Sequence, residues 1–149
     1  MKSINAQRII GIGTDIVKTD RIKALISRSN QSFKLRFISK VLSQFERSSE
    51  EFKLKETDDD QLTQFLANRW AVKEAAYKAI YPTYKPTWKQ LSFLKLKGII
   101  LSDNNNTIDN PKPILLFHPE DDIENSILKL HASISHDGNN TLAFVVACS

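Results

Sequence analysis

The amino-acid sequence predicts an α+β domain in which an antiparallel sheet packs against one long helix and several shorter helices. Three observations support this fold class. A segment of β-branched residues opens the chain, a long helical pattern occupies its middle, and short apolar runs separated by turn residues fill its last third. Because helices and strands are segregated along the chain, an antiparallel sheet is favoured over alternating βαβ units.

The first strand is predicted over residues 8–17, which are rich in isoleucine and valine. Gly11 and Gly13 lie inside it. A glycine within a strand weakens the strand and usually marks a bulge or a close approach of another backbone. Asp15 follows near the exit of the strand, so the sequence predicts a rigid element that carries one carboxylate.

Short helices are predicted between the first strand and residue 52. Thr19 can cap a helix over residues 20–29, and a second apolar run over residues 33–42 is expected to be helical. The sequence Ser43-Gln-Phe-Glu46 has the S-x-x-E pattern of a capping box. This pattern predicts a further helix that runs toward Phe52.

The longest helix is predicted over residues 61–80. Asp60 is a suitable N-cap, and Pro82 and Pro86 lie beyond its end, where they prevent the helix from continuing. On a helical wheel the apolar side chains form one stripe, which consists of Leu62, Phe65, Leu66, Val72, Ala76 and Ile80.

The last third of the chain has strand and turn patterns. The predicted elements are strands over 91–101 and 114–117, an asparagine-rich and mobile loop over 102–113, a short helix that opens at 119–122, and a hairpin of 128–135 and 141–147 around Asp137-Gly138-Asn139-Asn140.

The composition fits a single globular domain that spans residues 1–149. Hydrophobic residues make up 41% and charged residues 26% of the chain. The formal net charge of +4 favours acidic partners without naming them. Cys148 is the only cysteine, which excludes a disulfide framework and a cysteine-rich zinc site and predicts a packing role. No run approaches the ~18–20 apolar residues of a membrane span.

The long helix carries charges where apolar residues belong. Arg69 and Lys73 fall within the apolar stripe, and burying an unpaired charge is costly. They therefore require a polar cleft, a bound anion or a counter-charge. Glu74 lies on the margin of the stripe, and Lys78 follows it by one turn. This spacing is typical of an ordinary surface pair. A phosphate-bearing ligand would supply the counter-charge that Arg69 and Lys73 require.

Asp15 and Glu74 are candidate ligands for magnesium. Magnesium is commonly bound by one or two protein carboxylates, and water and phosphate oxygens complete its shell. The alternative for Asp15 is a strand-end carboxylate that faces water. The sequence alone does not show that the two carboxylates meet in space.

Two motifs resemble those of holo-acyl-carrier-protein synthases, the small 4′-phosphopantetheinyl transferases. Gly11-Ile-Gly-Thr-Asp-Ile-Val17, followed by Arg21-Ile22, resembles their N-terminal signature. Phe65-Leu-Ala-Asn-Arg-Trp-Ala-Val-Lys-Glu-Ala-Ala-Tyr-Lys78 is similar to their second, more specific signature. The tail with Ser133-Ile-Ser-His136 is similar to their C-terminal hairpin. The resemblance spans most of the chain, although residues 81–125 are longer and richer in asparagine than in typical bacterial members.

The resemblance implies the 4′-phosphopantetheinyl transferase fold and a role for each matching residue. The carboxylates of Asp15 and Glu74 would bind Mg²⁺, and the ammonium of Lys78 would face the pyrophosphate of coenzyme A. The nucleotide would be contacted by Arg69, with Lys73 in the same motif and His136 near the diphosphate. The catalytic residues implied are Asp15, Glu74 and Lys78.

The resemblance also implies the reaction. The phosphopantetheine arm of coenzyme A is moved onto a serine of acyl carrier protein, and adenosine 3′,5′-bisphosphate is released. Such a phosphoryl transfer depends mainly on positioning and charge stabilisation. Glu74, a metal-bound water and His136 are the candidates for the base that takes the serine proton.

A docking surface for the acidic carrier protein is predicted on the first helix. Arg21 and Arg28 are two helical turns apart, with Leu25 between them. A solvated basic face is the alternative. The resemblance further implies a homotrimer with active sites at the subunit interfaces.

Two other function classes fit part of the sequence. One is another magnesium-dependent phosphoryl or nucleotidyl transferase. The other is a basic nucleic-acid-binding module, but no motif with stacking aromatic residues accompanies the basic residues. The asparagine-rich segment and the basic N-terminus predict a eukaryotic, yeast-like source and a mitochondrial location, with a bacterial cytoplasmic enzyme as the alternative.

Overall fold

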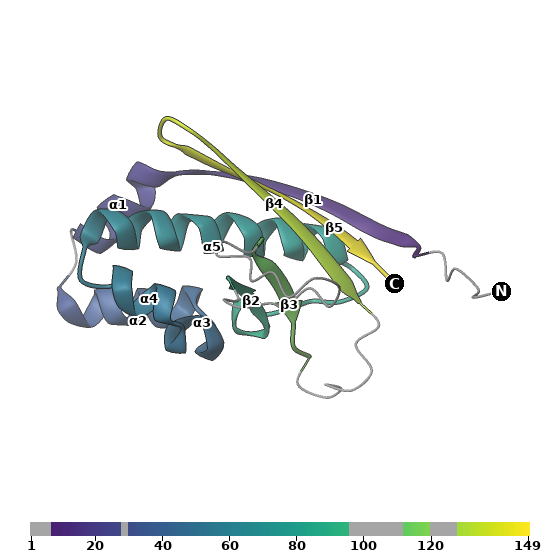
Figure 1. Cartoon of the computed structure of the whole chain (residues 1–149), viewed down its shortest axis with the longest axis horizontal. Helices are drawn as coiled ribbons and strands as arrows, with labels where there is room; N and C mark the ends of the chain where they lie inside the picture. The colour runs from purple at the N-terminus through teal and green to yellow at the C-terminus, as the bar shows by residue number, and fades with distance from the viewer. Residues whose placement is uncertain (1–6, 28–29, 96–111, 120–127) are drawn as a thin grey trace, which may run out of the picture.

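The computed structural model describes residues 7–27, 30–95, 112–119 and 128–149 (Figure 1). Most of the predicted asparagine-rich loop, residues 120–122 of the predicted short helix and residues 96–101 of the predicted strand lie outside the described residues. The elements in chain order are β1 (Ile9–Lys18), α1 (Thr19–Ser27), α2 (Gln31–Val41), α3 (Gln44–Ser48), α4 (Glu50–Lys55), α5 (Asp59–Ile80), the 3₁₀ turn η1 (Trp88–Gln90), β2 (Leu91–Leu94), β3 (Ile114–Phe117), β4 (Lys129–Asp137) and β5 (Asn140–Cys148).

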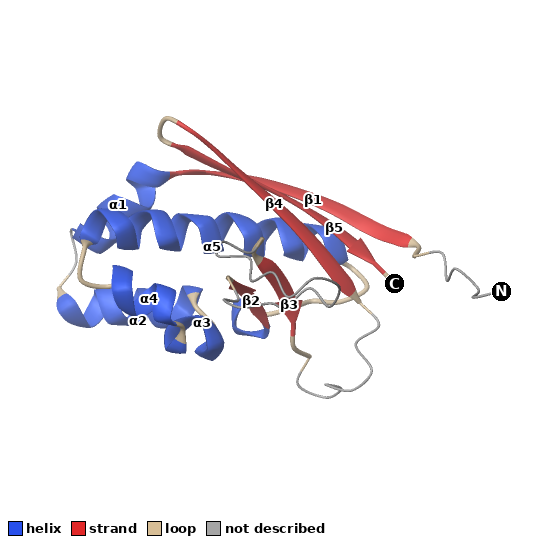
Figure 2. Ribbon diagram, in the orientation of Figure 1, coloured by secondary structure: helices blue, strands red, loops and turns tan. Residues whose placement is uncertain are grey.

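The five strands form one antiparallel sheet in the order β1-β5-β4-β3-β2, which confirms the predicted fold class (Figure 2). β1, β5 and β4 are long and pair along most of their length. Among the described residues, β3 and β4 pair at one position, Leu115 with Leu130. The short strands β2 and β3 therefore diverge from the long ones. The β4–β5 turn has Gly138 at φ 53°, a left-handed conformation that suits glycine.

The long helix α5 lies between the long strands and the helices α2, α3 and α4 (Figure 1). Every residue of the predicted apolar stripe is buried. A second buried row occurs at spacings of four residues, Ala67, Ala71, Ala75 and Ala79. Small side chains on this row allow a neighbouring element to come close to the helix axis.

β1 occupies that position. A Cβ atom added to Gly11 would lie 1.9 Å from the carbonyl oxygen of Ala79, and one added to Gly13 would lie 1.9 Å from the carbonyl oxygen of Ala75. Both glycines therefore mark a close backbone approach, as predicted. Asp15 is two residues beyond Gly13 on the same face of β1, so this approach places its carboxylate against α5.

Several predicted helix boundaries differ from the structure. Thr19, predicted as a cap, is the first residue of α1, and α2 begins at Gln31, not at residue 33. Asp58, not Asp60, is the N-cap of α5, because its side chain accepts hydrogen bonds from the backbone N–H groups of Asp60 and Gln61. The capping box at Ser43 and Glu46 is confirmed, but the helix it starts does not continue to Phe52. Ser49 has an extended backbone and caps a separate helix, α4. Among the described residues, none of the helices has the length and apolar content that crossing a membrane requires.

Candidate active site

Asp15 and Lys78 meet where β1 crosses the C-terminal half of α5. The Nζ atom of Lys78 lies 3.0 Å from Oδ1 of Asp15 and donates to the backbone carbonyl of Thr14 at 2.8 Å. The Lys78 side chain is 50% exposed and that of Asp15 is 18% exposed. Lys78 therefore forms its ion pair with Asp15, which is 63 residues away in the sequence. The Lys78 side chain nevertheless remains half exposed to solvent.

Glu74 precedes Lys78 by one turn and lies on the same face of α5. It is half-buried and forms no hydrogen bond or ion pair with another described residue. The Asp15 carboxylate, the Glu74 carboxylate and the Thr14 carbonyl supply only oxygen atoms. Hard oxygen donors that include two carboxylates suit Mg²⁺, which keeps water and phosphate oxygens in its shell. Within the described ranges, no cluster of three or more His, Cys, Asp or Glu residues is present that could form a closed metal cage.

Lys73 lies in a different environment, although it directly precedes Glu74 in the chain. It is 0% exposed. Its ammonium donates to the carbonyls of Val41 and Trp88, both at 2.8 Å, and to Oε2 of Glu46 at 2.6 Å. An ammonium has three N–H donors, so all of them are used inside the protein. Lys73 therefore has no free N–H donor with which it could bind coenzyme A, as the sequence analysis predicted it would.

Glu46 is the centre of this buried network. It is 0% exposed, and besides Lys73 it accepts hydrogen bonds from the backbone N–H groups of Ser43 at 2.7 Å and Phe93 at 3.0 Å. Burial lowers the pKa of Lys73, and the Glu46 carboxylate opposes this shift. The network joins α5 to the ends of α2, α3 and β2.

Arg69 is also buried, with 2% exposure. Its Nη2 atom donates to Oε2 of Glu51 at 2.9 Å and to the carbonyl of Phe93 at 3.2 Å, and its guanidinium lies 3.4 Å from the ring centroid of Phe65. Burial lowers its pKa, and Glu51 and Glu46 oppose this shift. Its Nε atom has no hydrogen-bond partner and lies 3.9 Å from Glu46. The sequence predicted a polar cleft, a bound anion or a counter-charge for Arg69 and Lys73. The structure shows counter-charges, which Glu46 and Glu51 provide.

Glu46 and Glu51, the two counter-charges, lie outside the residues predicted for the site. One signal could have identified Glu46. Its capping-box position directs its carboxylate toward a helix N-terminus, and the two buried cations of α5 require a carboxylate. Glu51 has no comparable signal in the sequence.

His136, on β4, contacts α5 through Asn68. Its Nε2 atom lies 2.8 Å from Oδ1 of Asn68. The same Asn68 oxygen accepts a hydrogen bond from Gln64, whose side chain also donates to Thr141. With Asn68 presenting its oxygen, we assign the proton to Nε2 of His136, which leaves Nδ1 free.

The structure therefore separates the predicted site residues into two groups. The first group, called the carboxylate cluster, consists of the contacting pair Asp15 and Lys78 together with Glu74, one helical turn before Lys78 on α5. Asn68, which holds His136, is ten residues before Lys78, which corresponds to about 15 Å along the helix axis. Arg69 lies about 180° around the helix from Lys78. A single chain does not bring all of these residues into one site.

Arg21 is exposed on α1, and its guanidinium lies 5.8 Å from the ring centroid of Trp70 on α5. This contact orients Arg21 beside the helix that carries the site. Arg28, the second residue of the predicted docking surface, lies outside the described residues.

The family of the chain follows from its relatives. The model of the 4′-phosphopantetheinyl transferase superfamily matches residues 11–132. The chain is 31% identical over 139 residues to the holo-[acyl-carrier-protein] synthase of Mycoplasmoides gallisepticum, covering 93% of this chain and 96% of the relative. It is 33% identical over 138 residues to that of Bacillus cereus, covering 93% and 94%. The chain belongs to the 4′-phosphopantetheinyl transferase superfamily.

Solved structures of this superfamily share the fold. A holo-ACP synthase from Plasmodium yoelii matches with a TM-score of 0.70 at 24% identity, covering 97% of this chain and 98% of that one. A holo-(acyl-carrier-protein) synthase from Bacillus anthracis, solved in complex with CoA (3′,5′-ADP), matches with a TM-score of 0.65 at 26% identity, covering 97% and 99%. The family, the fold and the enzyme class predicted from the sequence are confirmed.

Proposed function

We propose that this chain moves the 4′-phosphopantetheine arm of coenzyme A onto a serine of an apo acyl carrier protein and releases adenosine 3′,5′-bisphosphate. The family assignment favours this activity over the two alternative function classes. We place the active site at the contact between Asp15 and Lys78, because this contact joins one residue from each of the two motifs.

The carboxylate cluster is the proposed centre of the chemistry. Asp15 and Glu74 would hold Mg²⁺, which when bound stabilises negative charge on the pyrophosphate. Lys78 provides a compact positive charge, half exposed and fixed by Asp15 and Thr14, for a non-bridging phosphate oxygen. The carboxylate of Glu74 and the free Nδ1 atom of His136 are the described side-chain groups that can accept the proton of the serine hydroxyl.

The separation of the two groups supports an active site shared between subunits. The carboxylate cluster of one chain would combine with Arg69 and His136 of another. Along the axis of α5, Arg69 lies about 7.5 Å from Glu74 and about 13.5 Å from Lys78. The outer face of β1 and β5 supports the same proposal, because it exposes a row of large apolar side chains that suits burial against a second copy: Ile12, Ile16, Leu142 and Phe144. We therefore expect the predicted homotrimer.

The acidic carrier protein is proposed to dock on α1. Arg21 is exposed there and lies beside Trp70, and opposite charges chiefly raise the rate of association. Raised salt should therefore weaken carrier-protein recognition more than coenzyme A binding. The mitochondrial location remains a proposal that rests on composition.

The test is a transfer assay with purified chain, apo acyl carrier protein, coenzyme A and Mg²⁺. We expect the carrier protein to gain the mass of one phosphopantetheine arm. Asp15→Ala and Glu74→Ala should each abolish the gain while the circular dichroism spectrum stays unchanged. Lys18→Ala, an exposed residue at the end of β1, is the matched control and should keep the activity. Substantial Mg²⁺-dependent transfer by either folded carboxylate variant would contradict the assignment.

A quantitative test of the oligomer is analytical ultracentrifugation combined with the same assay. A trimer that loses activity on dissociation is expected. A fully active monomer would overturn the shared site and leave the transfer activity itself intact.

A further inference from the structure

Helix α1 begins directly after strand β1, because Lys18 is the last residue of the strand and Thr19 is the first residue of the helix. The first N–H groups of a helix have no acceptor within the helix, and a capping side chain just before it commonly supplies one. Lys18 stands at that position, and its ammonium is a donor and not an acceptor. The acceptors for the start of α1 must therefore come from another part of the chain.

Asn139, in the turn between β4 and β5, supplies these acceptors. Figure 1 shows this turn beside the start of α1. The backbone carbonyl of Asn139 accepts from the N–H of Thr19 at 2.9 Å, and its Oδ1 atom accepts from the N–H of Asp20 at 3.0 Å. Its Nδ2 atom donates to Oδ2 of Asp20. The exchange is reciprocal, as in a capping box, although 119 residues separate Asn139 from Asp20. Asn139 therefore caps α1 from the hairpin.

The side chain of Asn139 is suited to this contact, because an amide carries an acceptor and two N–H donors. Alanine would leave both groups of Asp20 without this partner, and aspartate would place a second carboxylate against that of Asp20. The turn itself does not account for the contact. Gly138, and not Asn139, takes the left-handed backbone conformation, with φ 53°. The Asn139 side chain therefore has a role beyond turn formation.

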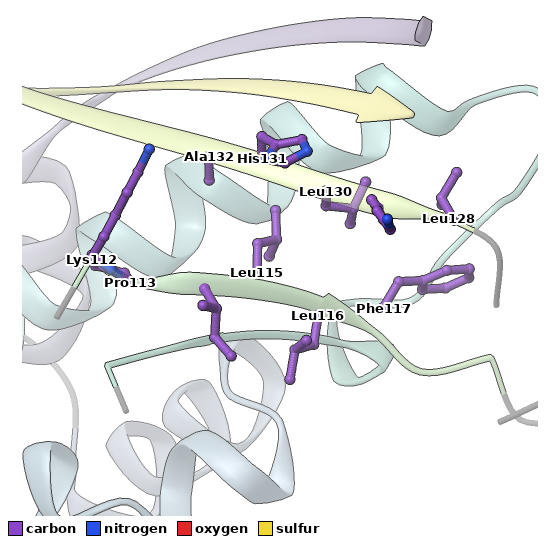
Figure 3. A pocket seen from close by; sticks show the side chains of 11 residues that line it. Lys112, Pro113, Leu115, Leu116, Phe117, Leu128, Leu130, His131 and Ala132 are labelled. Carbon is purple, nitrogen blue, oxygen red and sulfur yellow. The ribbon is translucent and has the colours of Figure 1, made fainter. Parts of the chain in front are cut away.

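The turn end of the hairpin lies beyond the strand that borders β4 on its other side. Within the described ranges, β3 pairs with β4 at Leu115 and Leu130 alone. Figure 3 shows the two strands side by side from Leu128 to Ala132, where a cavity of about 530 Å³ lies between them. Asn139 is seven residues past Ala132, so β3 does not support the turn. The contact with α1 thus holds the hairpin end as well as the helix.

The remainder of α1 is held by α5. Ile22 is buried in the core, and Nζ of Lys23 lies 2.8 Å from Oδ1 of Asp60 at the start of α5. Both contacts come after Arg21 in the sequence, whereas the contacts with Asn139 come before it. Arg21 therefore lies between two attachments of α1, and Asn139 provides the first of them.

Arg21 is the described residue of the proposed docking surface. Its guanidinium lies 5.8 Å from the ring centroid of Trp70, so its direction depends on how the first turn of α1 lies against α5. A group that is already held in its binding conformation loses less freedom when the partner arrives. A frayed first turn would have to become ordered before the partner bound, and this would lower the apparent affinity.

We propose that Asn139 is a positioning residue for docking of the carrier protein: by capping α1 from the hairpin, it holds Arg21 in the orientation that the acidic partner binds. This proposal rests on the proposed function, because it takes an acyl carrier protein as the partner. Asn139 lies outside both signatures that indicated the family. It acts through α1 and touches neither the carboxylate cluster nor the reacting groups.

The first test is Asn139→Ala in the transfer assay. We expect the KM for apo carrier protein to rise about two- to fivefold, because the loss of one helix cap shifts the balance between an ordered and a frayed first turn by up to that factor. The kcat and the KM for coenzyme A should not change. Hydrogen exchange at the amides of Thr19 and Asp20 should become faster. Asn140→Ala is the matched control, since the side chain of Asn140 forms no hydrogen bond with another described residue, and it should keep the original KM.

Exchanging the two partners tests the contact itself. Asn139→Asp should raise the KM for the carrier protein, because the new carboxylate repels that of Asp20. Adding Asp20→Asn restores one amide and one carboxylate in exchanged positions, so the KM should return toward its original value. Asp20→Asn combined with Asn139→Ala should not restore it. This second pair controls for the negative charge that Asp20→Asn removes from α1.

The outcomes separate the two proposals. If the protein transfers no phosphopantetheine, the proposed function fails, and the amide exchange still shows whether Asn139 caps α1. If transfer is intact but Asn139→Ala leaves the KM for the carrier protein unchanged, or if Asn140→Ala raises it equally, the positioning role of Asn139 is overturned. An exchanged pair that does not lower the KM below that of Asn139→Asp overturns it as well.

Discussion

Lys73 and Lys78 are only five residues apart on α5, but their environments are opposite. Lys73 is 0% exposed and donates three hydrogen bonds to groups on other elements. Lys78 is half exposed and donates to Asp15 and Thr14 on β1. The two lysines belong to one motif, yet the first holds the fold together and the second is available for chemistry.

The difference arises from their positions around the helix. Five residues rotate a side chain by about 140°, so the two lysines face different layers of the molecule. Lys73 faces the buried junction of α2, α3 and η1, where Glu46 neutralises it. Lys78 faces the edge strand β1, beside solvent. Residues of the same motif can therefore have different roles. Here the buried Lys73 stabilises the fold, and the exposed Lys78 is available to a ligand.

The largest loss of stability is expected for Lys73→Met, because it removes the nearest counter-charge of the buried Glu46 carboxylate and leaves only Arg69, whose Nε atom is 3.9 Å away. Breaking a buried ion pair in this way costs about 3–5 kcal/mol. Urea denaturation should show the loss. Lys78→Met is the matched control, since it removes the same group from an exposed pair. Equal losses for the two variants would contradict the structural role of Lys73.

A smaller loss is expected for Gly13→Ala. The new Cβ would lie 1.9 Å from the carbonyl oxygen of Ala75, so β1 must move away from α5. Overpacking of this kind costs about 1–3 kcal/mol. The shift also moves Asp15 relative to Lys78, so transfer activity per folded molecule should fall. Thermal unfolding and the transfer assay measure the two effects.

Gly138→Ala is the control for that variant. Gly138 has no atom within 4 Å of an added Cβ, but its φ of 53° is unfavourable for alanine. We expect a cost of about 1 kcal/mol and no change in transfer activity. Loss of activity in Gly138→Ala alone would show that the hairpin, and not the β1–α5 contact, positions the site.

A pH-dependent effect is expected from Glu51. Arg69 and Lys55 hold its pKa below the reference value of 4.5, although burial acts in the other direction. Its contribution to stability is therefore fully present above that reference pH and is lost as the pH falls through the lowered pKa. Glu51→Gln should flatten the acid side of the stability curve, measured by urea denaturation at a series of pH values.

Glu56→Gln serves as the reference for this series. Glu56 is exposed and forms no ion pair with a described residue, so Glu56→Gln removes one carboxylate without removing such a contact. An acid slope that Glu51→Gln does not alter would show that the Glu51–Arg69 contact contributes little to folding.

The smallest change in stability is expected for Lys78→Met, because an exposed ion pair contributes about 0–1 kcal/mol. Its effect on activity should nevertheless be large. Removing one group that stabilises transition-state charge lowers kcat by about 100-fold or more. Steady-state kinetics would test this. Unchanged kcat would place the pyrophosphate elsewhere.

Local patterns determined much of this protein. The β-branched run of β1, the turn at Gly138 and the apolar stripe of α5 are all short-range signals, and the structure confirms them. The close approach at Gly11 and Gly13 was one of the two predicted alternatives, the other being a bulge. The two motifs indicated the family for the same reason, as each is contiguous in the sequence.

Tertiary structure alone decided which charges meet. Lys73 and Glu46 are 27 residues apart, and Lys78 and Asp15 are 63 residues apart. Sequence periodicity shows that a charge lies on an apolar face, but it does not identify the partner, because that partner comes from another element. The packing of β1 and α3 against α5 made Lys73 part of the core and left Lys78 at the site.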